Sequence, residues 1–211
     1  MAAIAKNQAG EENDRWRVFP PECGVVAGVD EVGRGALFGP VVAAAVVLSA
    51  EAREALMVLG VRDSKKLSAQ RRESLSSQIR DLACDCQVGV ATVAEIDRLN
   101  ILQATLLAMR RAIEQLNPPP EYCAIDGNRP VPNLSIPQET IVGGDRTSIE
   151  IAAASIVAKV WRDNWVVAVA AEYPEYDLAR NKGYGTVRHR EALQRYGATR
   201  EHRQSFAPCR V

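Results

Sequence analysis

Residues 25–48 read VVAGVDEVGRGALFGPVVAAAVVL, and this stretch predicts the centre of the fold. Two runs rich in valine and alanine, residues 25–32 and 41–48, stand on either side of a glycine-rich turn. The second run is continuously apolar, which is typical of a strand buried on both faces. Because the turn holds Gly33 and Gly35, we expect the two strands to pair as a hairpin through it.

The rest of the chain alternates between helical and strand patterns. We expect helices over residues 68–83, 100–116, 147–172 and 188–196, and strands over residues 87–93 and 121–125. The helix that begins at Asn100 has apolar residues at steps of 4, 3, 4 and 3, which places them on one face. Thr147 and Glu150 form a capping-box pattern at the start of the next helix. Together these patterns predict an α/β or α+β domain built in layers.

The composition is that of a globular protein. The chain has 211 residues, 47% of them hydrophobic and 25% charged, which suggests one main domain. The longest apolar run, residues 41–48, is far shorter than the roughly 20 residues of a membrane helix. Residues 1–17 are polar and lack the apolar segment of a secretion signal. We therefore expect a cytoplasmic protein without a membrane anchor.

The net charge is zero, but it is unevenly distributed. The 26 Lys and Arg balance 26 Asp and Glu, which argues against a histone-like or polybasic protein. Residues 180–211 nevertheless hold eight Lys or Arg and two acids, a charge of +6, so residues 1–179 carry −6. We expect a flexible leader over residues 1–24, a main domain over 25–179, and a basic segment over 180–211 that contacts phosphates and completes a substrate cleft.

Zinc chemistry has little support in the sequence. The five cysteines are irregularly spaced without a CxxC pair, which fits free thiols in a reducing compartment. His189 and His202 are too few and too isolated to complete a zinc site with them. A metal site in this chain would use carboxylate ligands, which favour a hard cation such as Mg²⁺ or Mn²⁺.

Four acidic residues lie near the ends of expected strands or at a helix start: Asp30, Glu31, Asp126 and Asp145. Asp30 and Glu31 interrupt an apolar strand, where ionised groups are costly unless they are paired or bind a metal. Two divalent ions held by such acids about 4 Å apart can activate water for phosphodiester cleavage. The alternative is a buried ion pair, two turn aspartates and a helix cap. Adjacent strand residues point to opposite faces, so a shared site needs a distorted strand or a metal at its end.

Three loops carry further candidate residues. The segment 33–39 fails the G-x-G-x-x-G spacing because Phe38 stands at the third glycine, which weakens a dinucleotide-binding oxidoreductase interpretation. It is either a hairpin turn or a loop whose backbone approaches a sugar-phosphate while Arg34 contacts phosphate. Residues 63–67 place Lys65 before a helix, where a solvated cation is the usual role. Tyr184 lies between two glycines and could stack on a nucleotide or pack on the core.

The motifs of the whole chain resemble those of one family. In order they are GVDEVGRG at 28–35, DSKKL at 63–67, IDGN at 125–128, AAASIVAKV at 152–160 with RD at 162–163, KGYGT at 182–186, and HR at 202–203 with SF at 205–206. This series resembles bacterial ribonuclease HII, a type 2 ribonuclease H, over nearly the whole chain. The resemblance implies a ribonuclease H-like fold: a central mixed sheet flanked by helices, with a small helical C-terminal appendage.

The resemblance also implies a function and a set of site residues. It implies an endonuclease that hydrolyses RNA in RNA–DNA hybrids and nicks 5′ of single ribonucleotides in duplex DNA, with Mn²⁺ or Mg²⁺. The four acids named above match the family's metal-binding carboxylates. Gly33, Arg34 and Gly35 match the loop that reads the ribonucleotide, and Tyr184 matches a stacking tyrosine. Ser64 and Lys65 lie in a motif expected to reach phosphate.

Two residues depart from the family pattern. Ala36 replaces a usual proline, which we expect to loosen the loop, and Gly143 replaces a common lysine, which removes a nearby cation. Only about 24 residues precede the first motif, so the related ribonuclease HIII, with a longer N-terminal domain, fits less well. The leading hypothesis is a monomeric, metal-dependent endoribonuclease that serves ribonucleotide and RNA-primer removal and leaves 5′-phosphate and 3′-hydroxyl ends. The rival is a non-catalytic module that binds RNA–DNA hybrids on the same fold.

Overall fold

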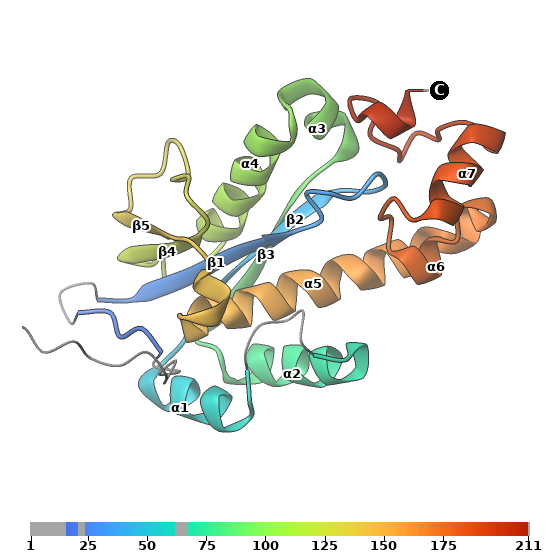
Figure 1. The fold of residues 1–211 in the computed structure, drawn as a ribbon. Helices are drawn as coiled ribbons and strands as arrows, with labels where there is room; N and C mark the ends of the chain where they lie inside the picture. The colour runs from blue at the N-terminus through green and yellow to red at the C-terminus, as the bar shows by residue number, and fades with distance from the viewer. Residues whose placement is uncertain (1–15, 21–23, 62–66, 211) are drawn as a thin grey trace, which may run out of the picture.

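The computed structural model describes residues 16–20, 24–61 and 67–210. Five strands form one mixed sheet in the order β3-β2-β1-β4-β5 (Figure 1). Their bounds are β1 Val26–Val32, β2 Val41–Val47, β3 Asp85–Ala91, β4 Tyr122–Asp126 and β5 Gln138–Ile141. The predicted hairpin is confirmed, because β1 and β2 pair antiparallel from Ala27↔Val47 to Val32↔Val42.

Helices cover both faces of this sheet. Their bounds are α1 Ala50–Val58, α2 Ala69–Leu82, α3 Val93–Leu99, α4 Ile101–Glu114, α5 Ile149–Val169, α6 Leu178–Asn181 and α7 Val187–Tyr196. Figure 1 shows α3 and α4 on one face and α1, α2 and α5 on the other. The apolar face predicted for α4 is confirmed: Leu106, Met109 and Ile113 are buried in one core cluster with the sheet. The second cluster joins α5, α2 and α1 to the opposite face.

The sequence predicted the N-caps of two helices, α4 and α5, and the structure confirms one of them. The Asn100 cap is confirmed, since its side chain accepts a hydrogen bond from the Gln103 amide at 3.1 Å. The capping box at Thr147 is wrong: Ser148 is the N-cap of α5, and its hydroxyl accepts from the Ile151 amide at 3.3 Å. Glu150 is instead buried and accepts from Arg53 at 2.6 Å. A tertiary ion pair thus takes the carboxylate that a capping box would have used.

Other boundaries differ from the expected ones. Strand β3 spans Asp85–Ala91 rather than residues 87–93, because Thr92 and Glu95 form a capping box that begins α3. The sequence interpretation also missed α1, α3 and the four-residue β5. Of the expected leader, residues 16–20 and 24 are described, and Arg17 pairs with Glu139 at 2.7 Å.

The C-terminal segment folds into short helices against the end of the hairpin. Leu37 and Phe38 share a core cluster with α7 and the 3₁₀ turn that holds Tyr176. The resulting molecule has the expected architecture, a mixed sheet flanked by helices with a small helical C-terminal part (Figure 1). Within the described ranges, no helix combines the length and apolarity that a bilayer crossing needs.

Candidate active site

Three carboxylates meet where two parallel strands separate. Strand β1 pairs with β4 only as far as Val29↔Ile125, so Asp30 and Asp126 follow directly beyond the last pair. The carboxyl ends of parallel strands share one edge of a sheet, which brings their side chains together. Oxygen atoms of Asp30, Glu31 and Asp126 all lie within 4.8 Å of one another.

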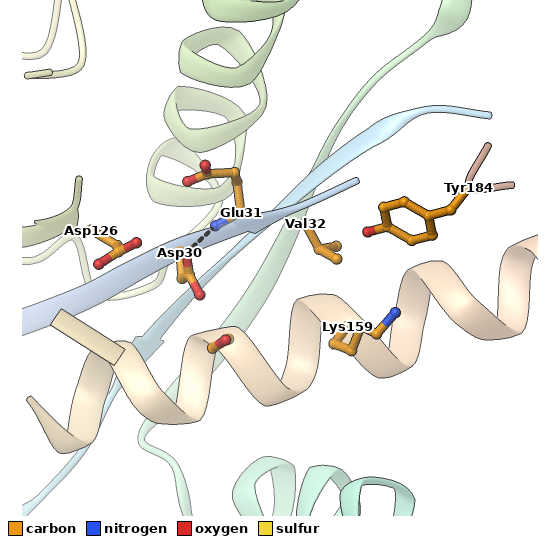
Figure 2. Close-up of a pocket in the computed structure, with 7 residues that line it drawn as sticks. Asp30, Glu31, Val32, Asp126, Lys159 and Tyr184 are labelled. Atoms are coloured by element: carbon orange, nitrogen blue, oxygen red, sulfur yellow. Dashed lines mark hydrogen bonds between the residues drawn. The ribbon is translucent and has the colours of Figure 1, made fainter. Parts of the chain in front are cut away.

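Asp30 and Glu31 share this edge without a break in their strand. The ladder with β2 continues through Asp30↔Ala44 and Glu31↔Ala43, so no distortion is needed there. In Figure 2, Asp30 points toward α5 and Glu31 points to the other side of β1. The Glu31 amide donates to Asp30 Oδ1 at 2.7 Å. Of the two solutions expected from the sequence, the end of the β1–β4 pairing brings the acids together, and a bulge does not.

The cluster is electrostatically unfavourable by itself. Burial raises the pKa of Asp30 well above its usual range, and the charges of Glu31 and Asp126 raise it further. Burial also raises the pKa of Glu31 and of Asp126, although Arg34 opposes the shift at Glu31. The Arg34 guanidinium donates to Glu31 at 3.1 Å. Three crowded oxygen donors with this repulsion fit a hard divalent cation, which would restore their ionised forms.

A pocket of about 260 Å³ opens over the cluster. Its lining is Asp30, Glu31, Val32, Asp126, Ser155, Lys159 and Tyr184 (Figure 2). Ser155 hydrogen-bonds to Asp30, which lowers the pKa of that carboxyl against the effect of burial. Lys159 Nζ lies 2.8 Å from Asp163 and 5.5 Å from the centre of the Tyr184 ring. The pocket therefore places a cation and an aromatic ring beside the acids.

The other predicted site residues have different positions. Asp145 is buried in a 3₁₀ turn beside Asp126, whose Oδ1 accepts from the Gly144 amide at 2.7 Å, but it is outside the three-carboxylate cluster. Gly33, Arg34 and Gly35 form the turn between β1 and β2. Ser64 and Lys65 lie outside the described residues.

The two departures from the family pattern have local explanations. Ala36 is buried, and its amide donates to the Gly33 carbonyl at 3.3 Å, a bond that proline could not make. The expected loosening is therefore opposed by an added hydrogen bond within the turn. Gly143 has a φ of +68°, and a Cβ there would lie 2.6 Å from Arg146 Nη2. A cation thus stands beside this position even without the lysine.

Two polar residues of the pocket had no role assigned from the sequence. Ser155 and Lys159 are one helical turn apart on α5, so they face the same side. Their i, i+4 spacing after a buried small-residue stretch was the available signal. It was weak because the sequence does not show which residues of the sheet a given side chain of α5 meets.

The sheet order, the flanking helices and the carboxylate edge define a ribonuclease H-like fold with a site suited to divalent metal. A comparison with protein-family models matches residues 27–209 to Ribonuclease HII. The chain belongs to the ribonuclease HII family. The Ribonuclease HII of Acaryochloris marina (strain MBIC 11017) is 62% identical over 88% of this chain and 94% of its own length.

Solved structures agree with this fold. The ribonuclease H2 of Pyrococcus horikoshii OT3 superposes with a TM-score of 0.76 at 28% identity, over 88% of this chain and 95% of that chain. Bst-RNase HIII in complex with Mn²⁺ gives a TM-score of 0.72 at 21% identity, over 88% and 68% of the two chains. The protein is thus an endoribonuclease of a family that acts on RNA–DNA hybrids and depends on divalent metal.

Proposed function

We propose that this enzyme nicks duplex DNA 5′ of single embedded ribonucleotides and also hydrolyses the RNA strand of longer hybrids. The observation that carries the proposal is the convergence of Asp30, Glu31 and Asp126 within 4.8 Å at the edge of the sheet. These three would hold divalent ions, with Asp145 beside Asp126 as a fourth ligand. Mn²⁺ or Mg²⁺ is the ion class that such oxygen ligands select.

The metal ions would supply water activation and charge stabilisation for in-line phosphodiester hydrolysis. The chain's own residues orient the reacting groups. Ser155 fixes Asp30 by a hydrogen bond, and Arg34 holds Glu31. Hydrolysis by water needs no attack from the 2′-hydroxyl, so the products would be 5′-phosphate and 3′-hydroxyl ends.

Ribonucleotide selection is assigned to the turn at Gly33, Arg34 and Gly35. A Cβ on Gly35 would meet nothing within 4 Å, so the backbone there is open to a ligand. Tyr184 lines the pocket over the carboxylates and presents a ring on which a sugar or base could stack. Ser64 and Lys65 stay predictions as phosphate contacts. The same holds for the three-part division at residues 24 and 179, for a monomer, and for a cytoplasmic role in ribonucleotide and primer removal.

The test uses a DNA duplex that contains one ribonucleotide, incubated with Mg²⁺, Mn²⁺ or a chelator. We expect a nick 5′ of the ribonucleotide only with metal, and none in the matched all-DNA duplex. Mass spectrometry of the products should show a 5′-phosphate and a 3′-hydroxyl. Hybrid binding without any nicking would support the non-catalytic alternative. A 2′,3′-cyclic phosphate product would contradict hydrolysis by water.

A further inference from the structure

Two arginines are wholly buried behind the turn between β1 and β2. Arg162 on α5 and Arg203 near the C-terminus each have 0% exposed surface. Every hydrogen bond found for their guanidinium groups goes to a backbone carbonyl. A buried guanidinium is costly unless its N–H groups are hydrogen-bonded. The planar shape of the two guanidinium groups therefore restricts the positions of the five carbonyl groups that accept from them.

The bonds define what these arginines hold. Arg162 donates to the carbonyls of Pro40 at 3.0 Å, Lys182 at 2.9 Å and Phe38 at 2.8 Å. Arg203 donates to Gly39 at 3.0 Å, Arg34 at 2.9 Å and Pro40 at 3.1 Å. We call residues 33–40 the recognition loop. The two arginines therefore link both ends of this loop to the segment at Lys182 through hydrogen bonds.

Close backbone packing supports the same arrangement. Gly33 has a φ of +90°, and a Cβ there would lie 2.2 Å from Arg162 Nε, so the turn rests directly on that side chain. Leu37 donates to the Gly183 carbonyl at 2.8 Å and accepts from the Arg203 amide at 2.9 Å. The backbone of the recognition loop at Leu37 is thus hydrogen-bonded to both Gly183 and Arg203, which restricts how far the loop can move.

A histidine pair fixes the neighbouring tyrosine. The Thr199 amide donates to His202 Nδ1 at 3.0 Å, so His202 carries its proton on Nε2. That proton is donated to His189 Nε2 at 3.0 Å, which leaves His189 Nδ1 to donate to the Tyr184 carbonyl at 3.0 Å. The direction of each bond follows from the first. The Tyr184 backbone is therefore held by a chain of buried groups that ends next to Arg203.

We propose that Arg203 is a positioning residue that sets the preference for a ribonucleotide over a deoxyribonucleotide, because its Nη1 holds the Arg34 carbonyl at the tip of the recognition loop. Arg162 supports the base of the same loop. The inference rests on the proposed role of residues 33–35 in reading the ribose. Lysine cannot replace this fork, since a single ammonium cannot reach three carbonyls in fixed directions.

The test compares Arg203→Lys with the unaltered enzyme on two duplexes. KM is measured on the duplex with one ribonucleotide, and the inhibition constant Ki of the matched all-DNA duplex is measured by competition. The ratio Ki/KM reports ribose preference, whereas a partly unfolded sample lowers the apparent kcat and leaves this ratio unchanged. We expect Arg203→Lys to reduce Ki/KM at least fivefold through a higher KM, with Ki unchanged within twofold.

A matched control is Arg53→Lys, which weakens a partly buried pair with Glu150 at the other end of α5. Its Ki/KM should equal that of the unaltered enzyme. An unchanged ratio in Arg203→Lys overturns the inference alone. A ratio near one in the unaltered enzyme overturns the proposed ribonucleotide reading, and this inference with it.

A second variant covers the case in which Arg203→Lys does not fold. The Asp97 carboxylate on α3 accepts from the amides of Gln204 at 3.0 Å and Ser205 at 2.9 Å, which anchors the residues that follow Arg203. Asp97 is partly exposed, so Asp97→Ala should leave the core intact. We expect a smaller fall in Ki/KM, of at least twofold. No change in this variant also overturns the inference.

Discussion

Individual carboxylates here act against the stability of the metal-free protein. Asp30 is buried, and Glu31 and Asp126 lie close enough to raise its pKa. A residue that costs stability and lies at the floor of a pocket is typical of a functional position. Removing its charge should therefore raise the stability of the metal-free protein and abolish its activity.

Asp30→Asn should abolish cleavage and stabilise the protein in the presence of chelator. The amide keeps the side-chain shape and relieves the repulsion, and about 1 kcal/mol of relief corresponds to a rise of roughly 2–4 °C in Tm. Metal should raise the Tm of the unaltered protein, because a ligand at 100 times its Kd adds about 2.7 kcal/mol. It should have much less effect on Asp30→Asn. Thermal unfolding with and without Mn²⁺ measures both effects.

The control is Asp81→Asn, an exposed aspartate on α2. This variant should keep the activity, the metal response and the Tm of the unaltered protein. Turnover by Asp30→Asn at the normal rate would contradict the assignment of the site. A Tm in chelator below that of the unaltered protein would instead show that the carboxylate has a structural partner worth more than the repulsion.

At the scale of elements, the site depends on how closely α5 approaches β1. Gly28 allows this approach: a Cβ there would lie 2.3 Å from the Glu150 carbonyl carbon and 2.4 Å from the Ile151 nitrogen. These are backbone atoms of α5, which cannot swing away as a side chain can. Ser155, which bonds to Asp30, lies on the same helix.

Gly28→Ala should therefore force the helix from the sheet and lower the free energy of unfolding. Overpacking of this kind typically costs about 1–3 kcal/mol. The matched control is Gly35→Ala, where a Cβ would meet nothing within 4 Å and stability should change by less than about 0.5 kcal/mol. Urea unfolding of the three proteins measures the difference. Equal midpoints for the two variants would show that β1 and α5 are not in such close contact.

The same elements show how much the sequence could predict. The hairpin was predictable because its apolar runs and glycine turn are local signals. The proximity of Asp30 and Asp126 was also predictable, because each lies at the end of an expected strand. Strand β5 was missed because its four residues, QETI, are mostly polar and pair only on one side, with β4. The capping box was wrong because Glu150 pairs with Arg53, a residue 97 positions away, which no local pattern contains.

The buried arginines were the least predictable feature of the site. Arg is rarely buried, so the sequence interpretation included Arg203 in the charge of the segment that was expected to contact phosphates. Arg203 does not contribute to such a surface, because it has 0% exposed surface and binds carbonyls. Only the long-range packing of the C-terminal segment against the recognition loop creates its environment. The +6 charge of residues 180–211 therefore includes one charge that serves the fold.

At the scale of the whole molecule, most of the remaining cations of this segment are exposed to solvent. The exposed ones are Arg180, Arg188, Arg190, Arg195, Arg200 and Arg210. Arg188 lies 3.6 Å from Asp177, and Arg200 lies 3.7 Å from Glu201. Each phosphate neutralised on a duplex contributes about 0.9 to the slope of log K against log salt. Because the total charge is zero and two of these exposed arginines lie beside acidic side chains, hybrid binding should weaken with salt less steeply than for a uniformly basic protein.

Arg190→Gln tests which cations contribute to that slope. Arg190 lies beside Gly185, the residue after the pocket residue Tyr184, since a Cβ on Gly185 would lie 3.3 Å from its Nε. Its loss should reduce the salt slope of hybrid binding by about 0.9 and weaken binding at low salt most. The control Arg80→Gln alters an exposed cation near Cys86, at the end of β3 far from the recognition loop, and should leave the slope unchanged. Binding measured by fluorescence anisotropy from 50 to about 200 mM salt gives the slopes. Equal slopes for Arg190→Gln and the unaltered enzyme would remove the C-terminal segment from the phosphate-binding surface.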